Sequence, residues 1–166
     1  KRTQKVFGDT IFYESFSNMS VMNNWTIVDN SGASRPWIWA NTAPGGPFTG
    51  AGPIQSPTTA NGFMQMPIDF YNTSVATDCN SLFQTTNYID LRDGNGNPRQ
   101  SVNISWWQAF RQNGAAADDM VFEVSTDGIN WVTYDVRGGT RSNDFFGSTP
   151  PYDGEEIGLN LTPILA

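Results

Sequence analysis

The side chains best suited to chemistry in this chain carry oxygen atoms or aromatic rings, because it has no histidine and one cysteine. Asp93, Asn95 and Asn97 alternate with glycines, as oxygen ligands do in a calcium loop. Pro98 and Ile104, however, stand where such a loop needs a glycine and a bidentate glutamate. We therefore interpret this segment as a hairpin turn.

Aromatic side chains offer a second kind of chemistry, since exposed rings stack on the apolar faces of sugars. Trp37 and Trp39 flank Ile38, so in a strand they would share one face. Other aromatic residues lie in or beside long segments with loop composition. The candidate binding residues are Trp37, Trp39, Phe145, Phe146 and Tyr152. Burial in a hydrophobic core is the competing interpretation for each tryptophan.

Catalysis has little support in the sequence. A serine nucleophile would lack a histidine base, and neither Ser-x-x-Lys nor Gly-x-Ser-x-Gly occurs. The single cysteine, Cys79, excludes an intrachain disulfide and a cysteine-rich metal site. A glycosidase-like carboxylate pair such as Glu14 with Asp119 stays open, because sequence does not give spatial separation. We expect a protein that is not an enzyme.

The charge balance is acidic, with a formal net charge of -7. The nine lysines and arginines are scattered, so the cationic surface that neutralises phosphates is missing from the pattern. Nucleic acid and anionic membranes are therefore poor partners. No apolar run has the length of a membrane span, and we expect no membrane insertion.

Short strands joined by polar turns are the structure that the composition favours, with 13% aromatic residues, 16 glycines and 10 prolines. Nowhere do apolar residues recur at helical spacing for three turns. The length suits a single domain. Alternation and turn signals predict strands at residues 10–16, 23–28, 37–39, 62–66, 88–91, 101–110 and 157–161, and a hairpin over residues 122–136.

The hairpin is expected to be scaffold, with its turn at Asp127-Gly128. The residues expected to fill the space between two sheets are Phe122, Val124, Trp131 and Val132, together with Ile104 and one of Trp106 and Trp107. The residues expected to face water are Glu123, Ser125 and Thr133. Function would then belong to loops at the ends of the sheets.

Several stretches in this order resemble one family: FYESF and NNWTIVD, then NGFMQM, IDL, SVNISWWQAFR, VFEVSTDGINWVTYDV and LNLTPILA. Together they are similar to the cleaved-adhesin and MAM-like jelly-roll domains of secreted Bacteroidetes proteins. The resemblance implies an all-β fold, a two-sheet antiparallel β-sandwich of jelly-roll type over residues 10–166, after a lead-in at residues 1–9. Family members usually continue with two more strands, so a longer chain or a partner would supply the last strands.

The resemblance also implies a function and a compartment. It predicts a non-catalytic adhesion module of a larger protein, secreted or held at the cell surface through type IX export, that binds glycan or protein. The alternative is a glycan-active enzyme or its accessory carbohydrate-binding domain. Structural Ca²⁺ would lie near the sandwich rim, with Glu14, Asp118 and Asp119 as ligands. A solvated loop end explains these carboxylates equally well.

Overall fold

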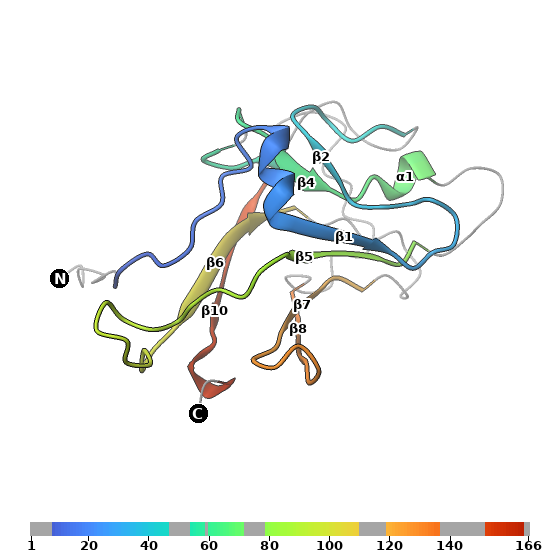
Figure 1. The fold of residues 1–166 in the computed structure, drawn as a ribbon. Helices are drawn as coiled ribbons and strands as arrows, with labels where there is room; N and C mark the ends of the chain where they lie inside the picture. The colour runs from blue at the N-terminus through green and yellow to red at the C-terminus, as the bar shows by residue number, and fades with distance from the viewer. Residues whose placement is uncertain are drawn as a thin grey trace.

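The computed structural model describes residues 8–46, 54–58, 60–71, 79–109, 119–136 and 152–164 (Figure 1). These residues form mostly strands with few helices, which agrees with the all-β expectation. The antiparallel pairs are β1 (Trp25–Asp29) with β5 (Ser81–Thr85), β2 (Ile38–Ala40) with β4 (Phe63–Gln65), β6 (Asn103–Gln108) with β10 (Glu155–Asn160), and β7 (Val121–Val124) with β8 (Val132–Asp135). The short strand β3 (Ile54–Gln55) runs parallel to β9 (Tyr152–Asp153). Since each described sheet has two strands, the two-sheet jelly roll stays a prediction.

The described helices are short. The 3₁₀ helix η1 (Met19–Asn24) begins after Asn18, whose side chain accepts a hydrogen bond of 2.9 Å from the Ser20 amide. Such a side-chain cap satisfies an amide that has no partner inside the helix. The helix α1 (Ile68–Tyr71) is one turn, and a second 3₁₀ helix, η2 (Thr162–Ile164), follows β10.

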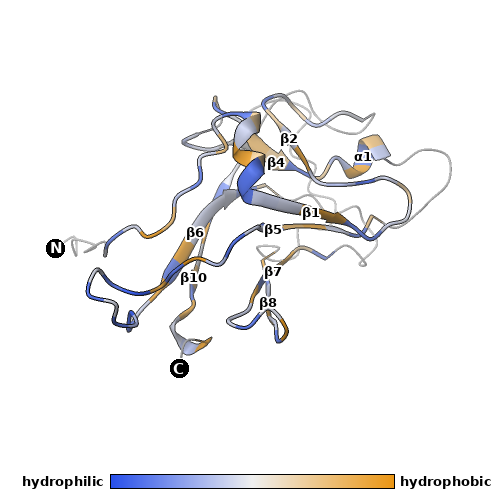
Figure 2. Cartoon of the chain, in the orientation of Figure 1, coloured by the Kyte–Doolittle hydropathy of each residue, from blue (hydrophilic) through white to orange (hydrophobic). Residues whose placement is uncertain are grey.

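An aromatic cluster joins β1, β5 and the segment before η1. The ring centroids of Trp25 and Phe83, on neighbouring strands, lie 5.1 Å apart, and Trp37 lies 5.0 Å from Phe83. Phe16 adds a contact at 5.7 Å from Trp25. Hydrophobic residues also lie on β4 and α1 in Figure 2. Aromatic packing of this kind therefore holds β1 and β5 to the segments that contain Phe16 and Trp37.

A second packing unit joins the β6–β10 ribbon to the β7–β8 hairpin. The Trp106 ring stacks on Phe122 with centroids 5.1 Å apart and 23° between the planes. The Trp106 indole N–H donates to Gln108 Oε1 at 3.0 Å, and the Gln108 amide donates to the Val136 carbonyl. Because Gln108 is buried, these bonds also satisfy polar atoms that would otherwise be costly to desolvate. The face of the ribbon that carries Trp106 and Gln108 thus packs against the hairpin.

Most predicted strands are confirmed, but two predictions of secondary structure are wrong. Residues 10–16 form no strand: Phe16 has φ of 51° and its amide donates to Glu14 Oε1 at 2.9 Å, so the chain bends there. Residues 88–91 form none either, and the strand of this region is β5, which begins seven and ends six residues earlier. A polar context around Cys79 hides the alternation of β5, whereas Tyr88 and Leu91 suggest a strand. The described pairing near Leu91 is limited to a hydrogen bond of 3.1 Å from the Arg99 amide to the Leu91 carbonyl and an isolated bridge between Arg92 and Pro98.

The expected interior of the hairpin is partly wrong. Phe122, Val124 and Ile104 are half-buried as predicted, and Glu123 and Thr133 face water. Trp131, in contrast, is 48% exposed. Adjacent residues of a strand point to opposite faces, so Trp131 and Val132 cannot both point inward. Pairing of Val132 with Val124 puts Val132 on the inner face, where it is still 42% exposed near the hairpin end.

Ser125 was also expected to face water but is half-buried. Its hydroxyl accepts a hydrogen bond of 2.8 Å from the Gly128 amide. Gly128 itself has φ of 73°, which glycine adopts without strain. The turn at Asp127-Gly128 is therefore confirmed, and Ser125 belongs to its hydrogen-bonded interior.

Candidate functional site

The outward side of the β6–β10 ribbon carries a regular set of exposed residues. The register pairs Trp107 with Glu156, Ser105 with Gly158 and Asn103 with Asn160, and all six residues are exposed. The alternate residues of both strands lie on the opposite face and are buried or half-buried, and on that face Trp106 and Gln108 contact the hairpin and the residue after it. We call the six residues Asn103, Ser105, Trp107, Glu156, Gly158 and Asn160 the outer face.

The position of Trp107 follows from that of its neighbour. Trp106 is held inward by Phe122 and Gln108, so the pleat must turn Trp107 outward, where it is 43% exposed. A flat ring is thereby presented on regular secondary structure rather than on a loop. The prediction that the two tryptophans point to opposite faces is confirmed. Trp106, expected in the core, is half-buried rather than fully buried.

The polar groups of the outer face retain capacity for hydrogen bonds. Within the part of the chain that the structure describes, no hydrogen bond involves the side chains of Asn103, Ser105, Trp107 or Glu156. Asn160 does use its oxygen, which accepts from the Thr162 amide at 3.0 Å. An indole N–H, a hydroxyl, an amide and a carboxylate are therefore directed to solvent beside an aromatic ring.

Gly158 is unexpected on this face, because glycine weakens a strand. Its φ is not in the left-handed region. Among the described residues, a Cβ built on it would have one neighbour within 4 Å, the Ile104 carbonyl oxygen at 3.9 Å. Neither backbone strain nor crowding by the described residues therefore requires glycine here. The same measurement shows that the Trp107 ring does not cover this position. Because Gly158 has no side chain, the centre of the outer face is a shallow, solvent-exposed depression.

An open pocket lies at the asparagine end of the outer face. It is lined by Asp93, Asn97, Pro98, Arg99, Gln100, Ser101 and Thr162. Ser101 and Thr162 continue the alternation of β6 and β10 outside the strands, and their hydroxyl oxygens lie 3.5 Å apart. The Arg99 guanidinium forms a 3.3 Å ion pair with Asp9, while its buried Nε has no hydrogen-bond partner within the described chain.

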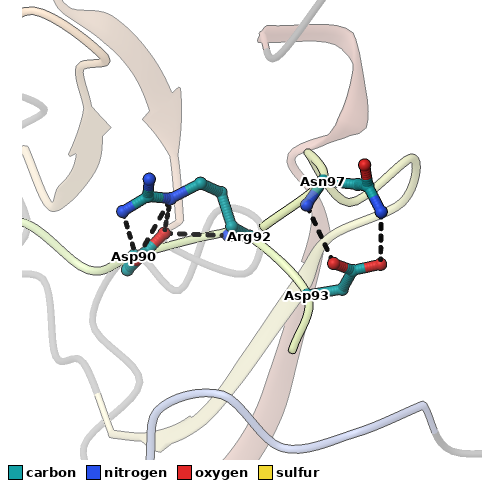
Figure 3. Close-up of polar contacts among 4 residues, drawn as sticks. All are labelled: Asp90, Arg92, Asp93 and Asn97. Atoms are coloured by element: carbon teal, nitrogen blue, oxygen red, sulfur yellow. Dashed lines mark hydrogen bonds and ion pairs between the residues drawn. The ribbon is translucent and has the colours of Figure 1, made fainter. Parts of the chain in front are cut away.

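The loop beside this pocket is held by two carboxylates (Figure 3). Asp93 accepts hydrogen bonds from the Asn97 amide at 2.8 Å and the Asn95 amide at 2.9 Å, and these bonds lower its pKa. Asp90 forms a 2.7 Å ion pair with Arg92, and the hydrogen bonds from Arg92 lower the pKa of Asp90 to about 2. The interpretation of this segment as a turn is confirmed: the Asp93 carboxylate closes it from within.

The tryptophans selected from sequence have structural contacts. The Trp37 indole donates to the Ser81 carbonyl at 2.9 Å, and the Trp39 indole donates to the Phe16 carbonyl at 2.8 Å. Both are half-buried. This geometry favours the alternative of a role in packing, and their role in binding stays a prediction. Phe145 and Phe146 lie outside the described residues, and of Tyr152 the structure describes the backbone in β9.

The structure describes two of the three carboxylates proposed for calcium, Glu14 and Asp119. Glu14 caps the Phe16 amide, Asp119 is exposed before β7, and Asp118 lies outside the description. Within the described ranges, no group of three histidine, cysteine or acidic side chains is close enough to hold a metal ion. Calcium binding therefore stays a prediction.

Sequence reasoning missed the outer face because it assigned binding to loops. The usable signal was the alternation Asn103, Ser105, Trp107, which sets a tryptophan among polar residues at a spacing of two. The sequence alone does not show which of the two adjacent tryptophans points outward, or that Gly158 lies beside it. Both follow from the pairing of β6 with β10 in the structure.

Comparison of the chain with family models, curated proteins and solved structures finds no match. In the described part of the chain, no helix is long and apolar enough to cross a membrane.

Proposed function

We propose that the protein is a non-catalytic binding module that recognises glycans with the outer face of its β6–β10 ribbon. The observation that carries the proposal is the exposed Trp107 ring, surrounded by small and hydrogen-bonding side chains on a regular ribbon. An aromatic ring contacts the C–H face of a sugar, while amide, hydroxyl and carboxylate groups bind its hydroxyls.

The composition of this surface favours a glycan over a protein ligand. The core of a protein interface is rich in aromatic and aliphatic side chains. Trp107 is the single large apolar residue among the six of the outer face. Polar side chains around one ring suit a ligand that is itself covered with hydroxyl groups. The open pocket beyond Asn103 and Asn160, most of whose lining residues have polar side chains, extends the same chemistry.

The wider setting is proposed from the sequence resemblance. We place the ribbon and hairpin in one end of a two-sheet jelly roll that belongs to a secreted or surface-held adhesion protein. The stacking of Trp106 on Phe122 supports face-to-face packing of two layers at this point.

Binding of the intact chain to immobilised polysaccharides tests the function. Wild type should bind a neutral β-glucan or galactomannan, and Trp107→Ala should lose at least about tenfold in affinity, since one ring supplies most of the apolar contact. Trp131→Ala is the matched control, because Trp131 is 48% exposed and Trp107 43%. Equal binding by wild type and Trp107→Ala would refute the proposal. Release of reducing sugar by the wild type would instead indicate an enzyme.

A further inference from the structure

We infer that the outer face selects a neutral oligosaccharide lying along the strands, with Gly158 as the floor of its central subsite and Glu156 as the residue that excludes acidic sugars. The inference rests on the proposed function and adds the ligand class and the two residues that determine it. It follows from the sizes of the side chains on the outer face, from the glycine at position 158 and from the position of the Glu156 carboxylate.

The outer face consists of three successive cross-strand pairs whose side chains differ in size. Trp107 and Glu156 stand at one end, Ser105 and Gly158 lie in the middle, and the asparagine pair stands at the other end. With a rise of about 3.4 Å per residue, Trp107 and Asn103 are separated by ~14 Å along the strand. A chain of a few sugar rings spans that length, stacking on the indole at one end and reaching the amides at the other.

Gly158 is the observation that points to a ligand independently of Trp107. A strand position without positive φ and without crowding would be more stable with a β-branched residue. Glycine in a strand interior marks a bulge, a tight bend, or close approach by a ligand or another backbone. The unbroken register of β6 with β10 shows no bulge at Gly158, so we assign this glycine to close approach by a ligand. The free space above Gly158 lies diagonally across the ribbon from Trp107. One edge of a sugar ring stacked on the indole would occupy this space.

Charge sets the class of sugar. Glu156 is opposite Trp107, so their Cβ atoms are separated by about 5 Å, and an acid group on a stacked sugar would lie within a few ångströms of the carboxylate. Arg99, at the far pocket, is paired with Asp9 and does not offset Glu156 at the indole. The net charge of -7 adds long-range repulsion of anionic polymers. A neutral sugar, in contrast, can donate hydroxyl hydrogen bonds to Glu156.

The role of Gly158 as the floor of the central subsite is tested with Gly158→Thr in the intact chain. Calorimetry measures the affinity of this variant for neutral β-glucan and galactomannan oligosaccharides. We expect unchanged or raised thermal stability together with at least about tenfold weaker binding, because the new side chain fills the central subsite. Gly158→Ala, which adds a single carbon with its nearest neighbour 3.9 Å away, serves if the threonine variant folds poorly. Unchanged affinity in a folded variant would overturn this role of Gly158.

The charge filter is tested with Glu156→Lys and with polygalacturonate as the anionic probe. Wild type should bind the neutral probe at least about tenfold better than polygalacturonate, and Glu156→Lys should gain about tenfold for polygalacturonate. Glu123→Lys is the control, since Glu123 is also exposed in a strand and the net charge changes equally. An equal gain in both variants would overturn the local role of Glu156.

The two levels of the proposal fail differently. If wild type binds no polysaccharide, the function is wrong and the inference falls with it. If wild type binds neutral sugars through Trp107 but Gly158→Thr binds equally well, the function stands and the inference is overturned. If wild type binds polygalacturonate as tightly as the neutral probes, glycan binding stands and the assignment of ligand class is wrong.

Discussion

Trp106 stacks on Phe122 with ring centroids 5.1 Å apart and an angle of 23° between the planes. This contact joins the β6–β10 ribbon to the β7–β8 hairpin and decides which side of the ribbon faces solvent. The inward position of Trp106 and the outward position of Trp107 are two consequences of the same pleat.

Loss of this stack should destabilise the fold, whereas loss of the neighbouring ring should not. Trp106→Ala is expected to lower the free energy of unfolding by about 2–3 kcal/mol, because it removes a half-buried ring and leaves a cavity. Trp107→Ala should cost less than about 1 kcal/mol, as surface changes generally do. Urea unfolding of both variants measures the difference. Equal costs would contradict the assignment of faces.

Gly62 should be one of the least replaceable glycines in the described chain. Its φ is 131°, and an added Cβ would lie 2.6 Å from the Trp39 ring. Gly62→Ala is therefore expected to destabilise by at least about 2 kcal/mol, through backbone strain and displacement of the indole. Gly94→Ala is the control, because its Cβ would have no neighbour within 4 Å among the residues that the structure describes. Thermal unfolding should separate the two variants clearly.

The hairpin turn should make stability depend on acid pH. Asp127 accepts hydrogen bonds from the Asn130 amide at 2.7 Å and the Ile129 amide at 2.8 Å, which hold its pKa below the ordinary value. A folded pKa below the unfolded one contributes stability above the unfolded pKa, and that contribution is lost as the pH falls through the folded pKa. The ordinary pKa of an aspartate is 3.8, so the loss should begin near pH 4 and continue below it.

Asp127→Ala provides the comparison for this pH effect. The variant should be less stable than wild type at pH 7, and the difference should shrink steadily below pH 4. Urea unfolding at a series of pH values measures it. A difference that stays constant to pH 2 would show that the charge of Asp127 does not stabilise the turn.

Glu14 offers a test that separates a backbone cap from a calcium ligand. Its carboxylate accepts a hydrogen bond from the Phe16 amide, which predicts that Glu14→Ala lowers the melting temperature equally with calcium and with chelator. A metal site would instead stabilise wild type by mass action when calcium is added, and the variant would lose that gain. Calorimetry at millimolar calcium and with chelator distinguishes these outcomes.

Local patterns predicted much of the secondary structure. The hairpin over residues 122–136 and the strands near Trp25, Phe63 and Trp106 follow from alternation bounded by turn residues. Residues 10–16 alternate in the same way but bend at Phe16, because a side-chain cap and packing on Trp25 replace strand pairing. Such contacts between distant segments leave no periodic signal in the sequence.

The candidate site was less predictable than the strands. A pair of adjacent tryptophans necessarily divides between two faces, but the sequence does not say which of them meets the hairpin. Gly158 and Trp107 are 51 positions apart and become neighbours through the register of β6 with β10. That register depends on the inward packing of Trp106 and Ile157, which no short window contains.

The most direct test of the central claim is a titration of the ¹⁵N-labelled protein with a neutral β-glucan or galactomannan oligosaccharide, observed at the indole N–H signals of its six tryptophans. The account predicts that the Trp107 signal shifts in a saturable manner, while those of Trp106, which is bonded to Gln108, and of exposed Trp131 stay in place. A saturable shift of Trp131 or Trp37 with Trp107 unmoved would place the binding surface elsewhere and contradict the account.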